Sequence, residues 1–132
     1  MTVKDHRELA CWQLSAQLRD EVIPILDNIP FPKDLDLCRD LSRSARSAPA
    51  NIAEGFGQSP RTFHRYLNIA KGSLRESGEH LDEALGRRYL TGEQHERFTT
   101  LARRALKATD RLAQYLDTLP PGRPRKRTWP NT

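Results

Sequence analysis

Residues 60–89 read PRTFHRYLNIAKGSLRESGEHLDEALGRRY and contain the clearest helical pattern in the chain. Small and apolar side chains recur there at alternating steps of four and three, which is typical of the inner face of a helix in a bundle. Ser59 and Pro60 have the residue types of an N-cap and a first-turn proline. We therefore predict a helix from Pro60 to about Tyr89, roughly 45 Å long. Its expected inner face consists of Phe63, Leu67, Ala70, Leu74, Ser77, Leu81 and Ala84.

The next segment predicts a second long helix. Thr91 and Gln94 have the spacing of a capping box, and Pro120 and Pro121 prevent the helix from continuing. The helix is thus expected over about residues 91–119. Its inner face is expected to consist of Phe98, Ala102, Ala105, Thr109, Leu112, Leu116 and Leu119.

A helix is also predicted near the start of the chain, from about Asp5 to Leu26. Pro24 should kink or end it, because an interior proline lacks a backbone donor and clashes with the preceding turn. The apolar face is expected to consist of Leu9, Trp12, Ala16, Leu18, Val22 and Ile25.

The remaining helix is expected to begin at Asp34, an N-cap candidate. Pro49 either ends this helix or kinks it. Because Ile52 and Phe56 keep a spacing of four after the proline, one kinked helix to about Phe56 is favoured over two short helices. The residues expected to reach the core are Leu37, Leu41 and Ala45.

These helices predict an all-α fold, an antiparallel up-down four-helix bundle. The short connections at about residues 56–59 and 89–91 make neighbouring helices antiparallel. Residues 1–119 are assigned to the bundle. Residues 120–132, PPGRPRKRTWPNT, are rich in proline and basic residues, so we predict a disordered basic tail.

Positive charge is concentrated in the last quarter of the chain. The 132 residues carry a net charge of +5. Residues 97–132 contain nine cations and two acids, a net charge of +7, whereas residues 1–96 contain thirteen cations and fifteen acids, a net charge of −2. An asymmetry of this kind indicates an acidic partner.

The basic quarter is the candidate binding site for nucleic acid, as structured RNA or DNA. The fourth predicted helix carries cations at intervals of seven residues, at Arg97, Arg104 and Arg111. Together with their neighbours they are expected to form one stripe that displaces counterions from phosphates. The tail would add phosphate contacts, and Trp129 could stack on a base. The alternative is a solvated helix face and a tail without a specific partner. The site residues are Arg97, Arg103, Arg104, Lys107, Arg111, Arg123, Arg125, Lys126 and Arg127.

Other function classes lack their sequence signals. No apolar run is long enough to span a membrane and the first residues do not have a signal-peptide layout, so we expect a cytoplasmic protein without membrane contact. Cys11 and Cys38 form no metal or redox motif and are expected to be reduced and half-buried. The chain has no Glu-x-x-His pair, phosphate-binding loop or nucleophile–histidine pattern. We therefore expect no enzyme activity, no metal and no cofactor.

Two motifs in the middle of the chain carry a family resemblance. RSAPANIAEGFG and FHRYLNIAKGSLRE together resemble the signature of the four-helix-bundle proteins called 23S rRNA intervening-sequence proteins. The resemblance implies assembly into a homopentameric ring. A related branch, the accessory variability proteins of diversity-generating retroelements, implies binding to nucleic acid and to a reverse transcriptase. An adaptor for such a protein is the alternative function. The chain departs from the pattern at Ala48, where the family tends to carry a larger aliphatic residue.

The polar and glycine residues of these motifs have structural and functional interpretations. Polar motif side chains on faces that approach another helix could bind a ligand, but a structural hydrogen-bond network is favoured because unpaired buried polar groups are costly. Helix packing is likewise the favoured role of the glycines, including Gly78. The motif residues assigned such structural roles are Pro49, Asn51, Glu54, Gly55, Gly72, Ser73 and Glu76.

Overall fold

The computed structural model describes residues 3–28 and 33–122. Over these residues the chain forms a short 3₁₀ helix, η1, and four α-helices, and it contains no strand in the same ranges. The all-α prediction is confirmed. The elements are η1 (His6–Glu8), α1 (Ala10–Ile25), α2 (Leu35–Gly55), α3 (Pro60–Gly86) and α4 (Gly92–Asp117).

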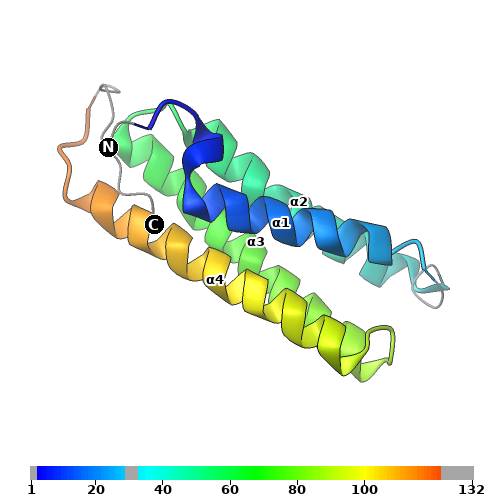
Figure 1. Ribbon diagram of the computed structural model, residues 1–132. Helices are drawn as coiled ribbons and strands as arrows, with labels where there is room; N and C mark the ends of the chain where they lie inside the picture. Colours follow the sequence, from blue (N-terminus) through cyan, green and yellow to red (C-terminus); the bar gives the residue numbers. More distant parts are fainter. Residues whose placement is uncertain (1–2, 29–32, 123–132) are drawn as a thin grey trace.

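The α-helices form the predicted antiparallel bundle. α1 packs against α2 and α4, and α3 packs against the same two helices, so each α-helix has two neighbours. Figure 1 shows the helices running up and down in chain order, with α4 closing the bundle beside α1. In the described ranges, no helix combines the length and the apolar character that crossing a bilayer requires.

The core runs along the bundle as two clusters of buried residues. Every residue predicted for the inner face of α3 is buried, and so is the predicted face of α4 up to Leu116. Large side chains such as Phe63 and Phe98 fill the two ends, and each contributes roughly 1.5–3 kcal/mol by leaving water. Ala48, which replaces a larger aliphatic residue in the family pattern, is 1% exposed. Small residues in the middle let the helices approach closely.

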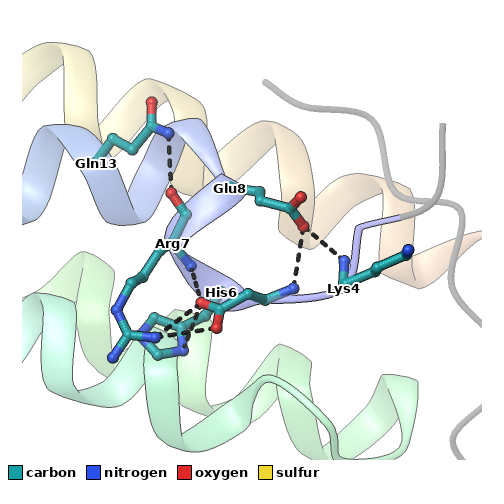
Figure 2. Close-up of polar contacts among 6 residues, drawn as sticks. Lys4, His6, Arg7, Glu8 and Gln13 are labelled. Carbon is teal, nitrogen blue, oxygen red and sulfur yellow. Dashed lines mark hydrogen bonds and ion pairs between the residues drawn. The ribbon is translucent and has the colours of Figure 1, made fainter.

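The first helical residues differ from the prediction of a single helix that begins at Asp5. Asp5 caps η1 by accepting from the backbone amide of Arg7 (2.8 Å), and Glu8 accepts from the backbone amide of Asp5 (3.0 Å). Figure 2 shows Glu8 beside Lys4, whose backbone amide also donates to the Glu8 carboxylate. Leu9 is extended and ends this turn, so α1 begins only at Ala10. The capping-box spacing of Asp5 and Glu8 was the sequence signal for this separate turn.

Most other helix limits agree with the prediction. α1 ends one residue after Pro24, and α2 continues through Pro49 as a single helix capped by Asp34. The capping box of Thr91 is present at the start of α4. α3 ends at Gly86, three residues early, because the chain turns through Arg88 in the left-handed region (φ 63°).

Candidate nucleic-acid interface

The side of α4 opposite the core carries exposed cations. Phe98, Ala105 and Leu112 point into the bundle, whereas Arg104 and Lys107 are exposed on the other side. Steps of three and four residues keep side chains on one side of a helix, and this spacing separates the cations from the core. The exposed cations predicted for the site on α4 are Arg97, Arg103, Arg104, Lys107 and Arg111.

Arg97 differs from the other cations because its charge is paired within the bundle. Its Nε and Nη2 donate to the two carboxylate oxygens of Glu21 on α1, at 2.8 and 2.7 Å. These hydrogen bonds raise the pKa of Arg97 and lower the pKa of Glu21. Arg97 therefore joins α1 to α4, and its charge is less available to a ligand than the sequence indicated.

The two acids of the basic quarter both turn towards α3. Asp110 accepts from Lys71 Nζ at 2.9 Å, a hydrogen bond that lowers the pKa of Asp110. Asp117 Oδ1 lies 3.1 Å from His64 Nε2. Within the described residues, neither acid pairs with a cation of α4, because each is turned to the α3 side of the helix. The cations on the outer side are thus left without a local counter-charge.

Arg104, Lys107 and Arg111 form the centre of the candidate interface. All three side chains are exposed, and none forms an ion pair with a carboxylate in the part of the chain that the structure describes. Three cations within two helical turns, spread over roughly 10 Å, give this side of α4 a concentrated positive charge.

Arg103 lies at the α3 side of this surface, near Arg75, which is a cation of α3. It donates to Thr100 Oγ1 at 3.2 Å. With Arg75 of α3 it lines a hollow of about 200 Å³ that passes over Gly78. Asp82 also lines this hollow, but it is paired with His95 at 2.7 Å. Sequence analysis missed Arg75, since no spacing within α4 reveals a neighbour on α3. We define the α4 basic face as Arg75, Arg103, Arg104, Lys107 and Arg111.

The remaining cations predicted for the site belong to the tail. They lie outside the described residues, as does Trp129. Of the predicted tail, the structure describes only residues 120–122, which follow the end of α4. The cations concerned are Arg123, Arg125, Lys126 and Arg127.

Two polar motif residues form the predicted hydrogen-bond network between α2 and α3. Asn51 donates to the carbonyl oxygen and the hydroxyl of Ser47, at 2.8 and 3.0 Å. Ser73 Oγ donates to Ser47 Oγ at 2.8 Å. Asn51 and Ser73 thus both bond to Ser47 within the bundle.

Glu54 and Glu76 do not take part in this hydrogen-bond network. Both side chains are exposed, and neither has a hydrogen bond or ion pair among the described residues. Ile69, which lies in the second motif, is 51% exposed although it is large and apolar. These motif residues therefore face outward and do not stabilise the bundle by pairing within it.

The glycine and proline residues of the motifs also have different roles. Pro49 is buried inside α2. A Cβ at Gly55 would lie 2.7 Å from Tyr66 Cβ, so only glycine fits where α2 meets α3. At Gly72 and Gly78 a Cβ would meet no atom within 4 Å. Close packing thus requires glycine at Gly55, whereas no neighbouring atom requires it at Gly72 or Gly78.

The described residues offer no metal site, and the chain is similar to a known family. In the described ranges, no cluster of three or more histidine, cysteine or acidic side chains is arranged to hold a metal ion. A search of curated proteins gave no match. A family model described as 23S rRNA-intervening sequence protein matches residues 7–110, which include both motifs and most of α4. The chain therefore belongs to the 23S rRNA-intervening sequence protein family.

Proposed function

We propose that this chain is a non-catalytic, homo-oligomeric binding protein of the cytoplasm that contacts nucleic acid through the α4 basic face and the tail. The observation that supports the proposal is the absence of ion pairs at Arg104, Lys107 and Arg111 among the described residues, while both nearby acids are held by α3. A surface with this charge releases condensed counterions when it meets a phosphate backbone.

A single copy of the face would bind weakly. Arg103 to Arg111 covers only about 12 Å of helix, enough for a few phosphates. Assembly would present several faces to one nucleic acid, and their combined affinity can exceed that of one face by about 100-fold or more. The family resemblance suggests a homopentameric ring, and structured RNA or DNA with many accessible phosphates would suit such a surface.

The second candidate function is an adaptor for another protein, such as a reverse transcriptase, with nucleic-acid contacts secondary. This alternative draws on the resemblance to accessory variability proteins. The observation that favours it is the outward position of three family-motif residues, Glu54, Ile69 and Glu76. Their side chains form no ion pair or hydrogen bond within the described bundle.

Fluorescence anisotropy with a labelled structured RNA tests the first function. Wild-type affinity should fall steeply between about 50 and 200 mM salt, as expected when phosphates are neutralised. The variant R104E/R111E should bind at least about tenfold more weakly, because two phosphate contacts become repulsive. R61E/R65E is the matched control, since Arg61 and Arg65 are also exposed and lie on α3.

The losses of RNA affinity in the two variants show whether binding depends on the α4 basic face. A much larger loss for R104E/R111E than for R61E/R65E supports the α4 basic face. An equal loss would show that affinity depends on net charge alone. If neither variant changes affinity, or if the wild type does not bind at low salt, the α4 basic face is a solvated surface and the adaptor function becomes the better explanation.

A further inference from the structure

The outer side of α2 has a groove with an apolar floor and a basic rim. The groove has a volume of about 860 Å³. Leu35 at one end is 59% exposed, which is unusual for a leucine on a helix of a bundle. The floor includes Ile23, Leu26, Leu35, Cys38 and Ala50, and the basic residues along it are Arg39, Arg43 and Arg46.

Within the part of the chain that the structure describes, the groove is lined by three arginines and one acid, Asp27. All three arginines are exposed. Arg43 pairs with Asp40 at 3.3 Å and Arg46 donates to Ser42 Oγ at 3.1 Å, whereas Arg39 has no ion pair among the described residues. Phosphate groups are charged and make no favourable contact with an apolar floor. This groove therefore fits an acidic helix with apolar residues better than it fits a nucleic acid.

The outer side of α3 in the same chain has the complementary chemistry. Ile69 is exposed there, and a row of exposed glutamates follows it along the helix. Glu76 and Glu79 have no ion pair within the described ranges, and Glu83 pairs with Arg87 at 2.9 Å. We call Ile69, Gly72, Glu76, Glu79 and Glu83 the α3 ridge.

Contacts between α2 and α3 determine which residues lie at the same height along the bundle. Asp34 contacts Arg87 (3.1 Å) at one end, and Ser44 contacts Ser77 (2.9 Å) near the middle. Gly55 lies against Tyr66 at the other end. Counting along the two antiparallel helices from these contacts places Arg39, Arg43 and Arg46 within one residue, about 1.5 Å, of the heights of Glu83, Glu79 and Glu76, and Ala53 within one residue of Ile69.

We propose that the α2 groove of one copy of this chain receives the α3 ridge of a second copy. If a rotation about an axis parallel to the long axis of the bundle generates the second copy, each residue keeps its position along that axis. Residues at the same height in the two copies can then face each other. Such a rotation therefore brings three arginines near the height of three glutamates, and Ile69 near the height of Ala53, one turn beyond Ala50 at the end of the groove. The two surfaces differ, so the contact is head-to-tail and repeats around a closed ring. This inference rests on the homo-oligomeric part of the proposed function and assigns its interface.

Charge-reversal variants test the interface through the mass in solution, measured by size-exclusion chromatography with light scattering over a wide dilution series. R43E/R46E and E76R/E79R should each raise the concentration needed for assembly at least about tenfold, because attraction becomes repulsion. The four substitutions combined in one chain should restore assembly, which a folding defect would not do. R104E/R111E is the control, since it reverses two exposed arginines outside the interface and should leave assembly unchanged.

Mixing the two double variants gives an independent result. R43E/R46E presents two acidic surfaces and E76R/E79R presents two basic ones, so each should assemble poorly alone. A mixture should assemble at lower concentration than either variant, although a ring with an odd number of copies retains one like-charged contact. Circular dichroism verifies that every variant remains helical.

The outcomes separate this inference from the proposed function. A wild type that assembles, with double variants that assemble equally well, overturns the interface and leaves the groove for a different partner. A wild type that stays monomeric throughout overturns the interface and the homo-oligomer together. In either case, the RNA affinity of R104E/R111E still decides the nucleic-acid function.

Discussion

Ser77 Oγ on α3 donates to Ser44 Oγ on α2 at 2.9 Å, and both hydroxyls are buried between the two helices. Ser44 also donates to the carbonyl oxygen of Leu41 at 3.2 Å, so each hydroxyl has a partner. A larger side chain at either position would push α2 and α3 apart. This contact thus joins α2 and α3 just beyond the two family motifs.

We expect Ser77→Ala to lower the free energy of unfolding by about 1 kcal/mol, the net value of one buried hydrogen bond. Ser77→Val should cost more, roughly 1–3 kcal/mol, because the added methyl groups do not fit between the helices. Urea denaturation followed by circular dichroism measures both. A stabilising effect of Ser77→Val would show that the interface has room, contrary to the packing described.

Gly55 and Gly78 should respond to alanine in opposite directions. Gly55→Ala places a Cβ against Tyr66 and Phe63, at 2.7 and 2.8 Å, and should destabilise the protein by about 1–3 kcal/mol. Gly78→Ala meets no atom within 4 Å, so it should stabilise the helix by roughly 0.5–1 kcal/mol through lower backbone entropy in the unfolded chain. Thermal unfolding compares the two. Equal effects would rule out the close approach at Gly55.

The Arg97–Glu21 pair should make stability depend on pH. Hydrogen bonds from Arg97 lower the pKa of Glu21 below its ordinary value of 4.5. A group with a lowered pKa in the folded state stabilises the protein above its unfolded pKa, and this contribution is lost as pH falls through the folded pKa. Glu21→Gln should therefore lower the urea midpoint at neutral pH and have little effect well below pH 4.5.

Glu96→Gln serves as the control for this measurement, because Glu96 is exposed on α4 and its carboxylate has no ion pair among the described residues. Its substitution should leave the midpoint nearly constant at both pH values. If Glu21→Gln behaved like Glu96→Gln, the pair would contribute nothing measurable to stability.

The two cysteines should differ in reactivity. Cys11 is fully buried, and burial raises the pKa of its thiol to about 12, so almost no reactive thiolate forms near neutral pH. Cys38 is half-buried in the α2 groove, and its pKa is also raised by burial. Iodoacetamide followed by mass spectrometry should modify Cys38 first and Cys11 only on unfolding. Assembly through the groove should slow the Cys38 reaction; faster modification of Cys11 would contradict the packing.

Local patterns in the sequence were sufficient for the helices. The inner face of α3 follows from spacing, since residues three or four apart must share one side of a helix. The caps at Asp34, Ser59 and Thr91 involve groups within a few residues of each other, so they too are local. The first helix was predicted too early because the Asp5–Glu8 turn was read as its first turn.

Interactions between helices required the tertiary structure. Arg97 and Glu21 are 76 positions apart in the chain, and no periodicity within α4 shows that α1 lies beside it. Arg75 joins the α4 basic face for the same reason. The matching heights of the α2 arginines and α3 glutamates depend on the register that Ser44, Ser77 and their neighbours create. Sequence periodicity specifies which side of each helix is buried, but only packing determines which charges become neighbours and which remain free to bind.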